Sequence, residues 1–589
     1  MNMRQMQQMQ QMQQRSQHRS VVRAFRRGAD LTGRCLRMTG GTLSLIVLLI
    51  VMFAELARPL NAFRHTSVPP RPWLQRRFRV QRSGLTMKQR DDGVLVVPEH
   101  GNRLHFVSLG CPRNLVDSEL MLGILLKNGY EVTDNMQEAD HIVVNTCGFL
   151  EAARRESLDE IGKAVEAKKD GAKVIVTGCM VNEHKDRIVQ ETPHIDYMLG
   201  AGNVEDILTA VRSTTPGEAL TAKSFIQAGD IPRQQTTPKH FAYLKIAEGC
   251  KKRCAFCIIP AIKGDLQSKS VQQIVKEFRL LRRNGVKEII LIAQDLGDWG
   301  KDLNLSQEFP LSHQAALANG TSSSRQQKGG LVPLLRTLLA EPGDYWLRLL
   351  YVYPDEIDDE LIELMASDRR LCRYLDMPLQ HVSDAVLRRM RRRTSKGEIE
   401  GLLTKLRAKV PDVSVRTSLM VGFPRETEDD FDELAEFIKR HPLDNVGIFR
   451  FSREEGSAAY DMEGQVEEAT KRRREETLAS IQQSVLADYQ RRKWVGKRLK
   501  VLVEGFVPES DFSVLQGRHD GQCPDIDGMV YLNEGLESVS RLGDFYEVDI
   551  TDVLDPPYDL LGRVVGRWPH EDQDKEGELA RRLSGFVRT

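Results

Sequence analysis

Residues 242–268 read Ala-Tyr-Leu-Lys-Ile-Ala-Glu-Gly-Cys-Lys-Lys-Arg-Cys-Ala-Phe-Cys-Ile-Ile-Pro-Ala-Ile-Lys-Gly-Asp-Leu-Gln-Ser. The apolar residues at the start of this stretch predict a buried strand, and three cysteines follow it at once. The spacing Cys250-x3-Cys254-x2-Cys257 lets three thiolates converge on one inorganic cluster from a single loop. A [4Fe–4S] cluster has four irons, so three protein ligands leave one iron open for a substrate or cofactor. Zinc is the alternative, but it needs a fourth Cys or His nearby, and His240 lies on the far side of the strand.

The cysteine triplet resembles that of the radical S-adenosylmethionine enzymes. The surrounding sequence, from Glu248-Gly-Cys to Gly264-Asp-Leu, is similar to that of the methylthiotransferase branch of that family, and within it to the RimO type. The resemblance implies that Cys250, Cys254 and Cys257 hold a [4Fe–4S] cluster. Its open iron would bind S-adenosylmethionine and cleave it to a 5′-deoxyadenosyl radical.

Three further cysteines share one position relative to three predicted strands. The strands are expected at 105–109, 142–145 and 173–177, and a cysteine stands two residues after each: Cys111, Cys147 and Cys179. Helical patterns between them predict a parallel sheet. In such sheets the residues just beyond the strand ends share one edge, so the three thiols are expected to meet. The alternative is that each is an ordinary small buried residue.

The surroundings of these cysteines also resemble the methylthiotransferases. Gly110-Cys-Pro-Arg-Asn-Leu-Val-Asp-Ser-Glu, Asn145-Thr-Cys-Gly-Phe and Thr177-Gly-Cys are similar to the three signature stretches of the N-terminal domain of that family. The resemblance implies that Cys111, Cys147 and Cys179 hold a second [4Fe–4S] cluster, which carries the sulfur to be transferred. The motif Cys-Pro-Arg-Asn resembles that of the RimO type, whereas the tRNA-modifying relatives usually have Gln-Met-Asn at this place.

Residues 240–492 predict an open (βα)6 barrel of the TIM type. The further strands are expected at 288–293, 346–352, 373–377, 413–421 and 446–451, and Ser270 is expected to cap a helix that ends at Asn284-Gly285. Active sites of such barrels lie at the carboxyl ends of the strands. The expected S-adenosylmethionine pocket therefore gathers polar residues from these ends: Gln294-Asp295, Tyr353-Pro354, Gln380-His381 and Gly422-Phe423-Pro424. Singly, each of them is more often a helix cap or a structural hydrogen-bonding group.

Two features of the barrel depart from the family pattern. Arg425 follows Gly-Phe-Pro where the family has Gly, and it would strain the turn if that position has positive φ. Residues 303–330 are rich in Ser, Gln, Asn and Gly and predict a flexible surface insertion. Residues 465–493 predict a long solvated helix.

Residues 493–567 predict a small all-β barrel that resembles the TRAM domain. Strands are expected at 500–504, 529–532, 545–551 and 562–565. RNA-binding barrels are expected to be basic, but residues 497–566 hold six Lys/Arg and fourteen Asp/Glu. An acidic barrel suits a basic partner such as a ribosomal protein; the alternative is a merely solvated acidic surface.

The first hundred residues predict a targeting sequence and linker without a core. Residues 1–90 hold seventeen Lys/Arg and two acids, whereas the rest of the chain holds 67 basic and 81 acidic residues. The apolar run at 43–54 matches a signal h-region and falls short of the ~20 residues that span a bilayer. The junction Leu60-Asn-Ala-Phe-Arg resembles the boundary of bipartite plastid presequences. We expect plastid import with no stable membrane anchor after processing; a mitochondrial presequence and a signal anchor are the alternatives.

The expected organisation is a presequence and linker (1–100), an N-terminal α/β domain (101–215), a linker (216–239), the barrel (240–492), the β domain (493–567) and a tail (568–589). The resemblance implies a methylthiotransferase that modifies the β-carbon of an aspartate in ribosomal protein S-twelve, free or in the small subunit. S-adenosylmethionine would supply the methyl group, and a ferredoxin or flavodoxin would supply electrons. The alternatives are a tRNA adenosine methylthiotransferase and a non-catalytic iron–sulfur carrier.

Overall fold

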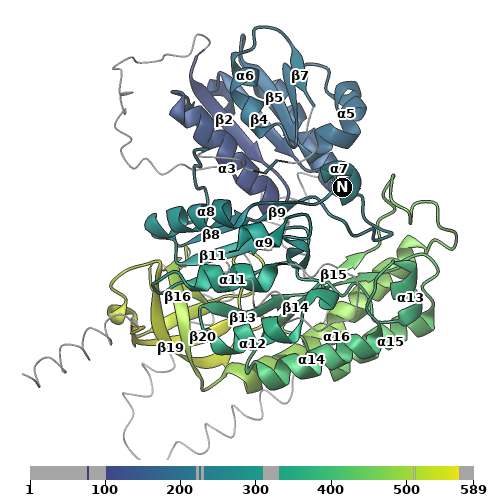
Figure 1. Cartoon of the computed structure of the whole chain (residues 1–589), viewed down its shortest axis with the longest axis vertical. Helices are drawn as coiled ribbons and strands as arrows, with labels where there is room; N and C mark the ends of the chain where they lie inside the picture. Colours follow the sequence, from purple (N-terminus) through teal and green to yellow (C-terminus); the bar gives the residue numbers. More distant parts are fainter. Residues whose placement is uncertain are drawn as a thin grey trace, which may run out of the picture.

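The computed structural model describes residues 76–77, 101–220, 225–226, 231–309, 330–508, 510 and 512–569. Within these ranges the chain forms three bodies (Figure 1). The predicted presequence lies outside the described residues, apart from the backbone of strand β1 (Arg76–Arg77). No helix in the described part is long and apolar enough to cross a membrane.

The N-terminal body is built on a seven-stranded sheet in the order β1-β2-β4-β5-β6-β7, with β3 beside β2. Every pair in it is parallel except β1 with β2. All six residues of the central strand β4 are buried, as expected where helices cover both faces of a parallel sheet. Besides β1, the strands of this sheet are β2 (Arg103–Ser108), β3 (Glu131–Val132), β4 (His141–Thr146), β5 (Lys173–Gly178), β6 (Tyr197–Gly200) and β7 (Gly217–Ala219).

Helices cover the two faces of this sheet and create a core on each. Leu120 and Phe106 belong to one core, and Ile161 and Val144 belong to the other. The predicted parallel α/β domain is therefore confirmed. The helices are α3 (Pro112–Lys127), η1 (Met136–Glu138), α4 (Glu151–Ala167), α5 (Cys179–Glu191), η2 (Val204–Asp206) and α6 (Ile207–Arg212).

The middle body is an open parallel barrel of six strands in the order β15-β14-β13-β12-β11-β8, which confirms the predicted (βα)6 fold. Its strands are β8 (Phe241–Lys245), β11 (Glu288–Ile292), β12 (Trp346–Leu349), β13 (Leu371–Asp376), β14 (Ser414–Val421) and β15 (Asn445–Arg450). A short hairpin of β9 (Ala247–Glu248) and β10 (Gln267–Ser268) follows β8. Helix α8 (Val271–Arg283) begins with the capping box of Ser270 and Gln273 and ends before Asn284, as predicted.

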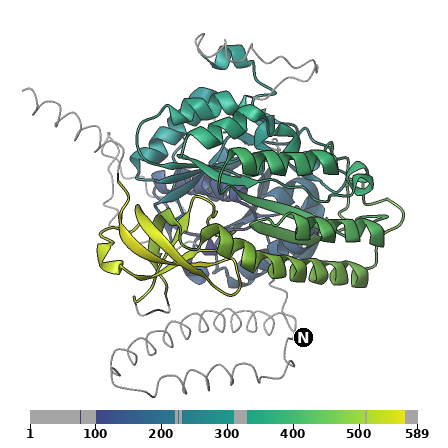
Figure 2. The ribbon, with the colours of Figure 1, turned by 90° about the horizontal axis from the view of Figure 1, so that it is seen from below.

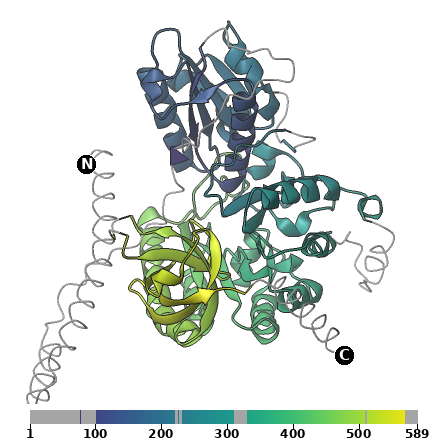
Figure 3. The same cartoon turned by 90° about the vertical axis from the view of Figure 1, so that its left-hand side faces the viewer.

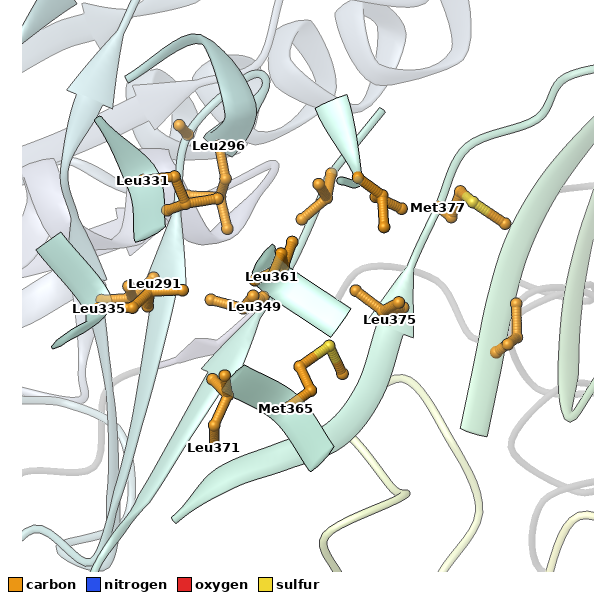
Figure 4. Packing of buried hydrophobic residues seen from close by; sticks show 14 of the residues in the cluster. Leu291, Leu296, Leu331, Leu335, Leu349, Leu361, Met365, Leu371, Leu375 and Met377 are labelled. Carbon is orange, nitrogen blue, oxygen red and sulfur yellow. The ribbon is translucent and has the colours of Figure 1, made fainter. Parts of the chain in front are cut away.

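Leucines and methionines from strands and helices fill the space between the barrel sheet and its outer layer. Residues of β11, β12 and β13 pack against α11 (Leu331–Leu339) and α12 (Asp359–Ser367) (Figure 4). The other elements of this body are α7 (Ile259–Lys263), η3 (Leu296–Asp298), α9 (Leu305–Glu308), η4 (Pro354–Glu356), α13 (Asp384–Arg389), α14 (Lys396–Lys409), α15 (Glu428–Arg440) and α16 (Glu468–Trp494).

Three segments differ from the sequence-based expectation. Within the described start of the predicted insertion, 303–309, residues Leu305–Glu308 form α9, and Phe309 is buried against Trp299; residues 310–329 lie outside the described part. Within the predicted linker 216–239, β7 pairs with β6 and extends the N-terminal sheet. Helix α16 is not fully solvated, because Leu478 packs into the barrel core. In each case long-range packing decides the structure where the local sequence is polar.

The C-terminal body is a closed barrel in the order β16-β17-β18-β20-β19, as the predicted all-β domain requires. The sequence did not predict β17, since Gly517, Arg518 and His519 interrupt any alternation of apolar and polar residues. The elements are β16 (Arg498–Phe506), β17 (Leu515–His519), β18 (Val530–Glu534), η5 (Leu536–Ser538), β19 (Asp544–Val553) and β20 (Leu560–Arg567).

The three bodies contact one another directly. The α/β domain sits beside β8 and β9 of the open barrel (Figures 1 and 3). The closed barrel packs against the amino ends of β8, β11 and β12, where Arg518 lies over Phe241 and pairs with Glu288, and Phe545 contacts Trp346. Seen from below, the closed barrel lies beside the green helical layer (Figure 2). Buried ion pairs hold the closed barrel in place: Arg518 binds Glu288 at 2.6 Å, with both side chains 0% exposed.

Candidate functional site

Cys111, Cys147 and Cys179 lie at the carboxyl ends of three neighbouring parallel strands. Cys111 is the N-cap of α3 beyond β2, Cys147 follows β4, and Cys179 is the first residue of α5 beyond β5. Gly110, with φ of 86°, lets two of these loops approach, since a Cβ there would lie 3.2 Å from the Cys147 sulfur. The sheet thus brings the three thiols to one edge.

Asn114 connects the three strand ends, and the sequence analysis gave it no separate role. Its Nδ2 donates to the carbonyls of Leu109 at 3.1 Å and Thr146 at 2.8 Å, which end the loops before Cys111 and Cys147. The Cys179 thiol donates to Asn114 Oδ1 at 3.5 Å. One buried amide therefore fixes the spacing of the three cysteine-bearing loops.

The protonation of these thiols reflects their closeness. Burial, together with the neighbouring thiols of Cys179 and Cys111, raises the pKa of Cys147 to about 12. Burial also raises the pKa of Cys179 to about 11, with Lys263 opposing the change and Cys111 adding to it. Three thiolates at this edge need a positively charged centre to be stable together, so the donor set fits an iron cluster.

Cys250, Cys254 and Cys257 lie on the loop between β9 and α7. Gly249, with φ of 75°, brings the loop against the opposite strand of the hairpin, because a Cβ there would lie 2.0 Å from the Asp265 carbonyl oxygen. The amide of Cys250 donates to Gly264 O at 3.2 Å, and that of Cys257 donates to Cys254 O at 3.1 Å. The hairpin and one tight turn therefore hold the loop.

Two side chains from other parts of the barrel reach the Cys254 sulfur. The hydroxyl of Tyr353 lies 3.7 Å from it, and Nη1 of Arg392 lies 3.8 Å from it. Burial raises the pKa of Cys257 to about 12 and that of Cys250 to about 11. The remaining described thiols, Cys372 and Cys523, lie beside Arg348 on the other side of the barrel, so this set, too, has three members.

The two sets of thiols meet at the interface between the α/β domain and the barrel. Cys179 packs against Ile258, which follows Cys257 directly, and against Ile262 of α7. Asn182 of α5 donates to the Ile262 carbonyl at 2.8 Å. The Arg113 guanidinium has Cys111 and Cys179 as neighbours and also opposes the rise in the pKa of Cys257 that burial causes. One interface thus carries both sets.

The polar residues predicted at the barrel mouth divide into two groups. Asp295 lies close enough to Cys250 to raise the pKa of that thiol, so it joins the second set of thiols as Tyr353 does. Gln294 instead donates to Glu248 Oε1 at 2.5 Å. Burial raises the pKa of Asp295 to about 7, although the neighbouring Lys252 opposes the change. Asp295, Asp298 and Glu356 could together hold a metal ion, but Lys252 already pairs with all three carboxylates.

The other predicted mouth residues have structural partners. His381 Nδ1 accepts from the Ser383 amide at 3.0 Å, and burial lowers the pKa of His381 to about 3, which keeps it neutral. The amides of Gly422 and Phe423 donate to Glu426. Gln380, with φ of 71°, bridges to β14. In the described part of the chain, these residues shape the mouth without hydrogen bonds to the cysteines.

Beside both sets of thiols lies a group of charged residues that the sequence motifs did not indicate. Its members are Arg113, Asp117, Lys245, Glu248 and Lys263. The sequence did contain an indication of this charged group, because Lys245 lies in an otherwise apolar strand, and all five residues of that strand are buried. Lys and Glu are almost never fully buried unless they are paired.

Three family models match the chain, one in each body. They are the uncharacterized protein family UPF0004 over residues 103–200, the radical SAM superfamily over 244–438 and the TRAM domain over 495–565. The ribosomal protein uS12 methylthiotransferase RimO of Protochlamydia amoebophila is 53% identical over 79% of this chain and 93% of that protein. The chain belongs to the RimO family. RimO of Chlamydia felis is 50% identical over 80% of this chain and 97% of its own length, and RimO of Bdellovibrio bacteriovorus is 41% identical over 79% and 97%.

RimO-family membership agrees with the resemblance drawn from the cysteine motifs. Among solved structures, the radical S-adenosylmethionine methyltransferase TsrM from Kitasatospora setae, with cobalamin and [4Fe–4S] cluster bound, matches with a TM-score of 0.41 and 15% identity. The match covers 59% of this chain and 74% of TsrM.

Proposed function

We propose that this chain is a radical S-adenosylmethionine enzyme that adds a methylthio group to the β-carbon of an aspartate in ribosomal protein uS12. The observation that carries the proposal is the contact of Cys179 with Ile258 and Ile262, which unites two open sets of three thiols at one interface in a RimO-family chain. Hydrogen removal and sulfur delivery can then act on the same substrate carbon.

The proposed cofactors are two [4Fe–4S] clusters and S-adenosylmethionine. Cys250, Cys254 and Cys257 would hold one cluster, and Cys111, Cys147 and Cys179 would hold the other. When bound, these groups supply the radical and the sulfur that no side chain provides, because an aliphatic C–H bond is not acidic enough for a general base. The protein orients the ligands through its loops and keeps water from the interface by burial.

The acidic closed barrel supports a protein partner. With six Lys/Arg against fourteen Asp/Glu, residues 497–566 are poorly suited to phosphate contacts. A basic ribosomal protein, alone or in the small subunit, fits this charge. The alternative function is modification of a tRNA adenosine, and evidence for it would replace this proposal. We also propose a ferredoxin or flavodoxin as the electron donor.

Two measurements test the function. Mass spectrometry of small-subunit proteins from a knockout should show uS12 lighter by one methylthio group, with unchanged tRNA nucleosides; a lost tRNA product with unaltered uS12 contradicts the proposal. Iron analysis of anaerobically reconstituted protein should give about eight irons per chain, and Cys147→Ala should give about four. The matched control Cys372→Ala, outside both sets, should keep about eight.

We also propose that residues 1–90 direct the protein to a plastid, on the basis of their basic composition and single short apolar run. Fusion of these residues to a fluorescent protein tests this, and fluorescence in the cytosol or mitochondrion contradicts it.

A further inference from the structure

The buried charged group at the domain interface carries an excess of one positive charge. Asp117 and Glu248 face three cations, Lys245, Lys263 and Arg113. Asp117, Lys245, Glu248 and Lys263 are each 3% exposed or less. Cluster thiolates at Cys111 and Cys179 would offset this excess, and within the group Lys263 is the cation without a carboxylate at hydrogen-bonding distance.

The two lysines differ in how well they are satisfied. Lys245 Nζ donates to Asp117 Oδ1 and, at 2.9 Å, to Glu248 Oε2. Lys263 Nζ lies 3.5 Å from Glu248 Oε2 and 3.7 Å from Asp117 Oδ2, and it makes no hydrogen bond in the described part of the chain. An ammonium group has three N–H donors. None of the three donors of Lys263 is therefore used by an acceptor in the described part of the chain.

The position of Lys263 decides which kind of ligand it can reach. It is the last residue of α7, six residues after Cys257. Its neighbour Ile262 packs against Cys179. Burial alone would lower the pKa of Lys263, but Cys179, Glu248, Asp117 and Cys111 raise it above the usual value. The free donors of Lys263 thus lie beside the thiols of the α/β domain, where the sulfur is delivered in the proposed function.

We propose that Lys263 binds the side-chain carboxylate of the substrate aspartate and thereby selects the carbon that receives the sulfur. The inference rests on the proposed function and names the specificity residue of that site. The β-carbon of aspartate is bonded directly to the carboxylate carbon, so a cation that holds the carboxylate beside Cys111 and Cys179 also fixes the β-carbon there. An asparagine or a neutral base carries no charge that could pair with the Lys263 ammonium.

The test compares Lys263→Met, Lys263→Arg and the matched control Lys245→Met in the full reconstituted protein, with uS12 and with uS12 whose target aspartate is replaced by asparagine. Lys263→Met should keep the wild-type iron content and the wild-type release of 5′-deoxyadenosine from S-adenosylmethionine. It should raise KM for uS12 about 10- to 100-fold, the effect of one charged hydrogen bond. Lys263→Arg should recover part of this loss. Lys245→Met removes a cation from the same carboxylates and should lower thermal stability without raising KM comparably.

The substrate pair provides a second readout, the difference in affinity between the two forms of uS12, which the wild-type enzyme should already show without any change to Lys263. Wild-type protein should bind uS12 about 10-fold or more tightly than the asparagine form, and Lys263→Met should bind the two forms equally. Loss of iron from Lys263→Met would instead assign the lysine to the cluster, and weaker binding of S-adenosylmethionine would assign it to the carboxylate of that cofactor; either result overturns the inference. Product formation by the wild type with unchanged KM in Lys263→Met overturns the inference alone, whereas no product with uS12 overturns the proposed function as well.

Discussion

The Arg392 guanidinium stacks on the ring of Tyr353, 4.0 Å from its centroid, and both side chains reach the sulfur of Cys254. Arg392 also donates to the Pro378 carbonyl, which anchors it to the loop after β13. Two parts of the barrel far apart in sequence thus converge on one proposed cluster ligand. Hydrogen bonds to ligand sulfurs are one of the means by which proteins set the reduction potential of a cluster.

Removal of the Tyr353 hydroxyl should therefore lower this potential. We expect Tyr353→Phe to shift the midpoint potential of the cluster on Cys250, Cys254 and Cys257 by about −40 mV, the one-electron equivalent of about 1 kcal/mol. A redox titration followed by electron paramagnetic resonance measures it. The control is Tyr345→Phe, another buried tyrosine stacked by an arginine, whose hydroxyl donates to backbone carbonyls. Equal potentials in Tyr353→Phe and the wild type would contradict the prediction.

Arg425 has φ of 62°, so the residue that departs from the family pattern does occupy a left-handed conformation. Its ion pair with Glu463 at 2.9 Å is exposed and contributes little. We expect Arg425→Gly to stabilise the protein by about 1 kcal/mol, because glycine adopts this conformation without a Cβ clash. Thermal unfolding measures the effect. Arg425→Ala, which keeps the Cβ and loses the ion pair, should not be stabilised; a gain in both variants would refute the strain argument.

Arg233 joins the α/β domain to the barrel from within the predicted linker. Its guanidinium pairs with Glu119 and Glu277 at 2.7 Å each, and its side chain is 6% exposed. Arg233→Met should destabilise the protein by about 3–5 kcal/mol, because it leaves buried carboxylates without this partner. Denaturant unfolding is the measurement. Arg103→Met breaks an exposed pair with Glu138 and should cost less than about 1 kcal/mol; similar costs for both would show that burial is not the cause.

Glu504 makes stability depend on pH at the interface of the closed barrel. Burial alone would raise its pKa, but Arg518 and His240 lower it from 4.5 to about 2. Because the folded-state pKa is depressed, the stabilisation is complete above about pH 5 and is lost as pH falls toward 2. Glu504→Gln should remove about 2 kcal/mol of the stability that the wild type loses between pH 6 and pH 3. Parallel losses in unfolding experiments on the two proteins would rule out this role.

The sequence predicted most of what local pattern encodes. Cys111, Cys147 and Cys179 each follow an apolar run, and parallel strands present such positions at one edge, so their meeting could be expected from the pattern. The helix from Ser270 to Asn284 was predictable because its cap and its end are local signals. β17 and the buried face of α16 were not, since their residues are polar and only long-range packing buries them.

The sequence alone determined the number of domains, the two sets of three thiols and the resemblance to an enzyme family, because these follow from the spacing of the cysteines and from the periodicity of apolar residues. Only the tertiary structure decided that Cys179 packs beside the loop of Cys257, and that Lys263 lies there with unused hydrogen-bond donors. The reason is physical: the residues involved lie far apart in sequence, and the domain interface that brings them together is set by buried packing and ion pairs that no local pattern records.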